Sequence, residues 1–261
     1  MLYRFNPAKE TIIDSGRFSH SAIDGSYINI LNWNIAKNNH TQEWHREFTD
    51  IFLQYRPDLI FFQEARIDPR TNQSIKLKEM GWNFAPNFID SYKDHYFGVL
   101  TASKAKHARR KSLLTQAHEP LLKTPKVALI TEYHLLQSKQ TLATVNCHGI
   151  NFVNTHRFKT QLHQIERWLS RHKGPIILSG DFNTWNSSRM NLLRAMSARL
   201  NLKQVDFSSS DRQQLKRFLF SDPLDHIFYR GLQEKPRSAR VLADISSSDH
   251  NPMVVEFFIP E

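Results

Sequence analysis

The sequence has a single cysteine, Cys147, among its 261 residues. One cysteine cannot form an internal disulfide, and it excludes zinc fingers whose metal is held by several cysteines. A chain with so few thiols suits a reducing compartment.

The sequence also lacks long apolar runs. No stretch approaches the roughly 20 apolar residues that span a bilayer. The first residues, MLYRFNPAKETIIDSGRF, are polar where a signal peptide needs its apolar segment. We therefore expect a cytoplasmic protein with no membrane span.

Linkers and internal repeats are missing as well. No Pro-, Gly- or Ser-rich segment or change of composition divides the chain, and its length is near the upper limit for one hydrophobic core. We expect one domain over residues 1–261, with residues 1–26 as an irregular N-terminal arm. We infer no protein partner and expect a monomer.

Acidic residues are fewer than basic ones, 25 against 35, which gives a formal net charge of +10 and a pI near 9.7. This excess favours contact with polyanions such as nucleic acid or anionic lipid, although soluble proteins can be basic without such partners. The densest basic run covers residues 104–111. It is either a solvated face or a patch that contacts a phosphate backbone.

The stretch GPIILSGDFNTW, residues 174–185, carries the strongest chemical pattern. A short apolar run, Ile176 to Leu178, predicts a buried strand. Asp181 and Asn183 follow at its tip, one residue apart, so their side chains leave on the same side. Both can then meet one phosphate or one metal ion.

The same pattern recurs along the chain. Predicted strands over residues 27–35, 59–62, 98–103, 127–134, 141–148, 223–229 and 253–259 have polar side chains near several ends: Asn34, Glu64, His148, Asp225, Asp249 and His250. Taken alone, Glu64 reads as a surface residue and Asn34 as a turn residue. One domain can bring all of them together only at one edge of a sheet.

Helical spacing of apolar residues predicts helices over residues 37–55, 161–169 and 188–202, a short one over 75–80 and a weaker one over 213–220. The aromatic residues between 82 and 97 are interpreted as a loop.

Hard oxygen ligands of the kind collected here select Mg²⁺ or Mn²⁺ rather than zinc. They suggest metal-assisted attack on a phosphate ester, in which a histidine acts as acid or base.

Five segments in this order resemble the endonuclease/exonuclease/phosphatase superfamily, the DNase I-like fold. They are LNWNI, FFQEA, the strand ending in VNCH, SGDFN, and PLDHIF followed by SSDHNP. GVLTAS, SGDFNTW and SDHNPMVVEF look most like the bacterial YafD-type branch. The resemblance implies an α/β fold, a four-layer α/β/β/α sandwich of two mostly antiparallel sheets.

The resemblance also implies roles for individual residues. Asn34, Glu64 and Asp249 would bind the metal, with Glu64 as the principal ligand. The catalytic set would be His148, Asp181, Asn183, Asp225 and His250. In that set Asp181 would orient or deprotonate the attacking water, Asn183 would hold the scissile phosphate, and Asp225 would fix the ring of the phosphate-binding His250.

Two Asn-x-His sites compete for one motif, Asn146-Cys147-His148 and Asn154-Thr155-His156. We favour His148 because the motif should close a strand, whereas His156 leads directly into a helix. The glutamate that pairs with this histidine in secreted DNases has no counterpart near Gly98. His226, next to Asp225, is interpreted as structural.

These features predict a Mg²⁺- or Mn²⁺-dependent phosphodiesterase, with nucleic acid as substrate and nuclease action on DNA or RNA. A phosphatase or phosphodiesterase for small or lipid phosphates needs the same phosphate site and stays open. A nucleic-acid-binding module without catalysis is disfavoured because every predicted catalytic position holds a competent residue.

Overall fold

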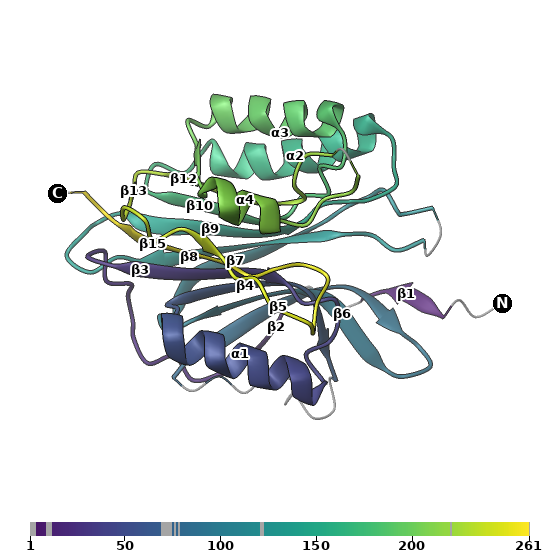
Figure 1. The fold of residues 1–261 in the computed structure, drawn as a ribbon, viewed down its shortest axis with the longest axis horizontal. Helices are drawn as coiled ribbons and strands as arrows, with labels where there is room; N and C mark the ends of the chain where they lie inside the picture. Colours follow the sequence, from purple (N-terminus) through teal and green to yellow (C-terminus); the bar gives the residue numbers. More distant parts are fainter. Residues whose placement is uncertain are drawn as a thin grey trace.

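Helices cover the outer faces of two packed sheets (Figure 1). The computed structural model describes residues 4–8, 12–68, 75, 77, 79–120, 123–219 and 221–260. Figure 1 shows α2 and α3 over one sheet and α1 over the other. This arrangement confirms the predicted α/β sandwich. The helices are α1 (Gln42–Tyr55), α2 (Thr155–Leu169), α3 (Ser187–Arg199) and the short α4 (Ser209–Gln214).

In the described residues the first sheet has the order β1-β5-β6-β4-β3-β15-β13, while β2 pairs with β5 and β14 with β15. Only β3 and β4 run parallel among these pairs. The strands are β1 (Phe5–Pro7), β2 (Ile13–Gly16), β3 (Ile28–Asn34), β4 (Leu59–Ile67), β5 (Gly81–Asp90), β6 (His95–Ser103), β13 (Gln233–Glu234), β14 (Arg240–Val241) and β15 (Met253–Phe258).

The second sheet, over the same described residues, has the order β11-β12-β10-β9-β8-β7. Only β9 and β10 run parallel within it. The strands are β7 (His107–Leu114), β8 (Val127–His134), β9 (Thr141–His148), β10 (Ile176–Asp181), β11 (Lys203–Gln204) and β12 (Asp225–Arg230). Both sheets are therefore mostly antiparallel, as predicted.

The alternation of apolar residues along β3 explains how the layers pack. Ile28 and Ile30 lie in the core between the two sheets, whereas Leu31 and Trp33 lie in the core under α1. Trp44 of α1 stacks on Trp33 with ring centroids 5.9 Å apart. Complete burial of a large apolar side chain contributes roughly 1.5–3 kcal/mol, so this contact fixes α1 on the outer face of the sheet.

The aromatic segment between residues 82 and 97 is not the predicted loop. It forms most of β5 and the start of β6, which pair with each other. The register of the pair shifts between Pro86 and Phe88, so the proline is accommodated at an irregularity instead of ending the strand. Strand β5 also pairs with β1 and β2, which makes the N-terminal arm part of the first sheet.

Two helices do not form as predicted, and a third begins earlier than predicted. The helix expected over 213–220 is replaced by α4, which ends at Gln214, because Leu215 is extended. In the range 75–80, Ile75, Leu77, Glu79 and Met80 are not helical, and the remainder lies outside the described residues. Helix α2 begins at Thr155, six residues before the predicted start at Gln161, because Asn154 caps it.

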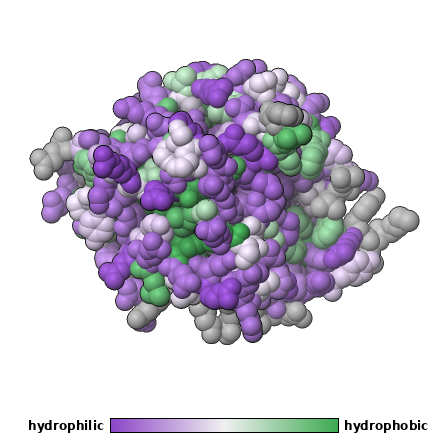
Figure 2. Space-filling view, in the orientation of Figure 1, coloured by the Kyte–Doolittle hydropathy of each residue, from purple (hydrophilic) through white to green (hydrophobic). Residues whose placement is uncertain are grey.

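The face drawn in Figure 2 is mostly hydrophilic, with apolar residues gathered in a hollow near its centre. In the described part of the chain, no helix is both long enough and apolar enough to cross a membrane.

Candidate active site

The parallel strand pairs place their carboxyl ends at one edge of each sheet. Asn34 ends β3 beside Gln63 of β4, and His148 ends β9 beside Asp181 of β10. Strand β12 runs antiparallel to β10, so its first residue, Asp225, also lies opposite Asp181. Asn34, His148, Asp181 and Asp225 therefore meet where the ends of the two sheets face each other.

Asp181 joins the two sheets at this edge. One carboxylate oxygen accepts a hydrogen bond from the Asn34 amide at 2.9 Å, and the other accepts one from the backbone N–H of Asn183 at 2.9 Å. The residue is 2% exposed. Burial, followed by the neighbouring carboxylate of Asp225, raises the pKa of Asp181 to about 7.

His250 and Asp225 form a buried ion pair on one side of Asp181. Nδ1 of His250 lies 2.7 Å from an oxygen of Asp225, and Nε2 lies 4.0 Å from Asp181. Burial disfavours the imidazolium, but the Asp225 charge outweighs it and raises the pKa of His250 to about 10. The backbone oxygen of His250 accepts a hydrogen bond from Trp33 at 2.8 Å, which anchors the loop.

Glu64 lies in a bulge of β4. Its φ is +52°, and the pairing of β4 with β6 shifts register between Phe62 and Ala65. A bulge of this kind redirects a side chain. The Glu64 carboxylate forms an ion pair with Lys37. Burial raises the pKa of Glu64, but the charges of Lys126 and Lys37 outweigh burial and lower it, which keeps the carboxylate ionised.

His148 stands between Glu64 and Asp181, with Nε2 at 3.8 Å and 3.7 Å from their oxygens. Burial and the charge of Lys126 hold the pKa of His148 well below its usual value. His156 lies elsewhere, exposed near the start of α2, after the capping residue Asn154. The structure thus brings His148, and not His156, into the cluster.

The amide of Asn183 donates to the Gly149 carbonyl at 2.9 Å, so the residue ties the loop after β10 to the loop after β9. Asp249 is placed differently from the prediction. Its side chain is 63% exposed and pairs with Lys216 at 3.0 Å, so its carboxylate does not join the buried cluster. Because the Asp249 carboxylate is exposed, it can form this ion pair with Lys216.

The His226 side chain is not part of the cluster around Asp181. Its ring nitrogens contact Thr184 at 2.8 Å and Gln204 at 3.0 Å, inside the second sheet's layer. Burial lowers the pKa of His226 to about 4. These contacts fit the structural interpretation.

Two neighbouring donor sets could hold a cation. Glu64 and Asn34 offer a carboxylate and an amide oxygen, the hard donors that suit Mg²⁺ or Mn²⁺. Among the described residues, ligand atoms of Asp181, Asp225 and His250 also lie within 4.8 Å of one another. The charged His250 would repel a cation, and burial raises the pKa of Asp181 to about 7. The ionised Glu64 therefore fits a divalent ion better.

Arg189 of α3 supports the site and was missed by the sequence interpretation. It is buried, donates to the backbone oxygens of Asn183, at 2.7 Å, and Ile150, and lies 3.9 Å from the ring centroid of Phe158. It therefore links the loops that follow His148 and Asp181. Its position on the apolar side of a predicted helix was the available signal.

Known proteins resemble this chain in sequence and in fold. A model of the endonuclease/exonuclease/phosphatase family matches residues 31–250. A UPF0294 protein of Vibrio campbellii (strain ATCC BAA-1116) is 35% identical over 231 residues, which cover 88% of this chain and 77% of the relative.

Solved structures show the same fold. The catalytic domain of human nocturnin, solved with bound sulfate, has a TM-score of 0.66 and 19% identity, covering 95% of this chain and 97% of the other. The mannosyl-6-phosphatase of Bacteroides thetaiotaomicron has a TM-score of 0.63 and 14% identity, covering 89% and 100%. With a family match over most of its length and a relative above one-third identity, this chain belongs to the endonuclease/exonuclease/phosphatase family.

Proposed function

We propose that the chain is a divalent-metal-dependent phosphodiesterase that hydrolyses nucleic acid, and that it acts as a nuclease on DNA or RNA. The observation that carries the proposal is the buried cluster in which the Asp181 carboxylate lies between His148, at 3.7 Å, and His250, at 4.0 Å. A base between two imidazoles is an arrangement that can bind a phosphate and activate a water beside it.

Each residue has a role in this proposal. Asp181, fixed by Asn34 and the backbone of Asn183, orients the attacking water and takes its proton. His250, held in its charged form by Asp225, contacts a phosphate oxygen. The proposed metal ligands are Glu64 and Asn34.

When bound, Mg²⁺ or Mn²⁺ supplies positive charge against the charge that develops on the phosphoryl oxygens. Lys37 and Lys126 lie near the candidate active site, because their charges act on Glu64. Together with the net charge of +10, they favour a polyanionic substrate over an isolated monoester.

A substrate panel tests the proposal. Purified protein is assayed with Mg²⁺ on supercoiled plasmid, single-stranded and abasic DNA, RNA, sugar phosphates and phospholipids. We expect hydrolysis of at least one nucleic acid that EDTA abolishes. An Asp181→Ala preparation made in parallel reports contaminating nucleases. Hydrolysis of sugar phosphates or phospholipids alone contradicts the nuclease proposal and favours the phosphatase alternative.

A further inference from the structure

A basic groove lies at the end of the second sheet that is remote from the candidate active site. We call it the distal groove; its volume is about 570 Å³. It is lined by Ala108, Arg109, Glu132, His134, Lys139, Gln140, Thr141, Trp168, Arg171, His172, Lys173 and Gly174.

The two sites occupy opposite ends of the same strands. Thr141 begins β9, and His148 ends it. With about 3.3 Å per residue, the ends of this strand are roughly 23 Å apart. The distal groove is therefore separate from the cluster around Asp181.

The basic run at residues 104–111 contributes Arg109 to the lining of this groove. Arg109 pairs in register with Glu132, and Lys111 with Ile130, whose side chain lies in the core under α2. Arg109 and Lys111 thus share the outer face of β7, an edge strand. Arg110, between them, binds Asp14 at 2.6 Å and Asn83 at 2.9 Å on the side of the first sheet.

Positive charge dominates the lining. Arg109, Lys139, Arg171 and Lys173 are exposed, and none forms an ion pair with another residue that the structure describes. Glu132 is the acidic residue in the lining. Four cations against one carboxylate around one cavity form a local site for a polyanion.

The groove also has a flat wall. The rings of Trp168 and His172 are nearly parallel, with an interplanar angle of 12° and centroids 6.2 Å apart. His172 is fixed in turn by a contact of 2.9 Å between Nε2 and the Thr141 carbonyl. Aromatic rings beside a basic groove are the elements with which proteins bind single strands, because unpaired bases can stack on them.

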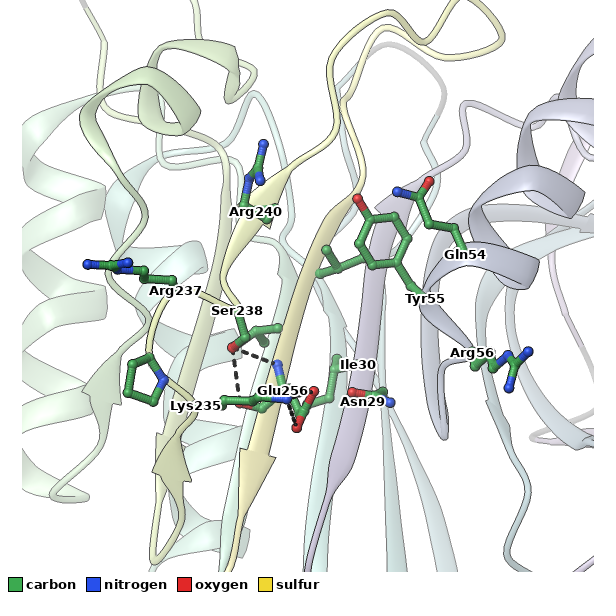
Figure 3. Close-up of a pocket in the computed structure, with 13 residues that line it drawn as sticks. Asn29, Ile30, Gln54, Tyr55, Arg56, Lys235, Arg237, Ser238, Arg240 and Glu256 are labelled. Carbon is green, nitrogen blue, oxygen red and sulfur yellow. Dashed lines mark hydrogen bonds and ion pairs between the residues drawn. The ribbon is translucent and has the colours of Figure 1, made fainter.

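Another trough, at the outer face of β3 and β15, lacks these features. Figure 3 shows Arg56 and Arg237 extending away from it on opposite sides. Lys235 is neutralised by Glu256, at 2.8 Å. Its cations do not converge, so it offers no comparable site.

We propose that the distal groove binds a single strand of nucleic acid, with phosphates on Arg109, Arg171 and Lys173 and a base against Trp168. This inference deepens the proposed nuclease function and rests on it for the identity of the substrate. The groove would hold the strand at a distance from the edge where hydrolysis takes place.

Equilibrium binding in EDTA tests the groove without hydrolysis. The anisotropy of a fluorescein-labelled oligothymidylate is measured at several salt concentrations with the full chain. The groove variant is Arg171→Gln/Lys173→Gln. The matched control is Arg46→Gln/Lys203→Gln, which removes the same charge from exposed positions on α1 and β11. Thermal unfolding verifies that both variants fold.

We expect the groove variant to bind more weakly and its slope of log K against log salt to fall by about 1.4, since each phosphate contact on a single strand contributes about 0.7. Trp168→Leu should reduce affinity about tenfold with little change in the salt slope. The control should bind like the wild type.

Equal losses in the groove variant and the control would overturn the proposal, because net charge would then explain binding. Binding to phosphatidylserine vesicles without binding to the oligonucleotide would overturn it in favour of a membrane surface. The two proposals fail separately: Mg²⁺-dependent hydrolysis with no groove effect on binding removes the groove alone, whereas groove-dependent binding without hydrolysis removes the nuclease function alone.

Discussion

At the scale of the residue, Gly180 explains how Asp181 reaches its neighbours. Gly180 has φ +147°, and a Cβ there would lie 1.9 Å from the backbone oxygen of Cys147. No other residue allows β10 to approach β9 so closely at this point. The glycine in the SGDFN motif therefore serves the close approach that brings Asp181 beside His148.

The choice between two histidines is a prediction at this scale. His148→Ala should reduce kcat on the phosphodiester substrate by about 10²–10⁴, because an acid–base or phosphate-binding group contributes that much. His156→Ala should leave kcat near the wild-type value, since His156 is exposed on α2. The check is steady-state kinetics with Mg²⁺. Loss of activity in the second variant alone would assign the motif to His156.

Some residues of the site could be placed from the sequence, and others could not. Asn34, Asp181 and His148 could be placed because an apolar run fixes where a strand ends, and parallel strands end at one edge. The orientation of Asp249 could not be predicted, because it depends on Lys216, which is distant in sequence. The apolar side of a predicted helix signalled that Arg189 is buried, but its partners could not be predicted because they are backbone carbonyls.

At the scale of the element, Arg189 connects α3 to the loops of the site. Arg189→Met should lower the free energy of unfolding by on the order of 2 kcal/mol, because two buried carbonyls lose a charged donor. It should also lower kcat, since the loop carrying Asn183 loses its anchor. The matched control is Arg194→Met, whose wild-type side chain is 58% exposed and pairs with Asp222 at 3.6 Å; its effect should stay within about 0.5 kcal/mol.

Urea unfolding and steady-state kinetics measure these effects. Equal stability and activity in the Arg189 and Arg194 variants would show that the buried guanidinium supports neither the fold nor the site.

Asp211 connects α4 to β14 and makes stability depend on pH. Its carboxylate accepts hydrogen bonds from Ser208 and from the backbone N–H of Val241, at 2.9 Å, and lies 3.4 Å from Arg240. Burial opposes the charge, but these partners outweigh it and lower the pKa of Asp211. A lowered pKa in the folded state gives stability that is present above the unfolded pKa and lost as pH falls through the folded value.

Asp211→Asn should therefore be less stable than the wild type by on the order of 1 kcal/mol at neutral pH. The difference should be constant from about pH 5 to 8 and shrink below about pH 4, the unfolded pKa of aspartate. Urea unfolding across this range measures it. A difference that persists unchanged at low pH would contradict the role of the charge.

The bounds of three elements were missed, although two of them have a capping signal in the sequence. Asn154 caps α2, but the Asn-Thr-His sequence drew attention to a catalytic motif instead. Ser208 likewise caps α4, and its hydroxyl accepts from the backbone N–H of Asp211 at 3.1 Å. This Ser-x-x-Asp signal was present in the sequence. Strand β5 could not be predicted from local signals, because its pairing with β1 and β2 on one side and β6 on the other makes it a strand.

At the scale of the whole molecule, one core joins residues of both sheets. Ile28 and Phe61 of the first sheet pack with Leu142 and Ile177 of the second. We predict that residues 1–261 unfold in one cooperative transition, because neither sheet can keep its inner face buried alone. Calorimetry should give a van't Hoff enthalpy equal to the measured enthalpy. Two resolved transitions would contradict the single-domain prediction.

The family and layered architecture were predictable because five motifs extend over most of the chain in a fixed order. The distal groove was not, because it combines the basic run with Lys139 and the end of α2. Net charge indicates a polyanionic partner, but only the fold determines which cations share a face.

The rate at which the wild type, Asp181→Asn and Asp50→Asn hydrolyse nucleic acid in Mg²⁺ tests the proposed role of Asp181 directly. Asp50 is an exposed aspartate of α1 and serves as the matched control. We predict a loss of about 10²–10⁴ in kcat for Asp181→Asn, because the amide cannot accept a proton, and wild-type activity for Asp50→Asn. Undiminished hydrolysis by Asp181→Asn would contradict the proposal that Asp181 takes the proton of the attacking water.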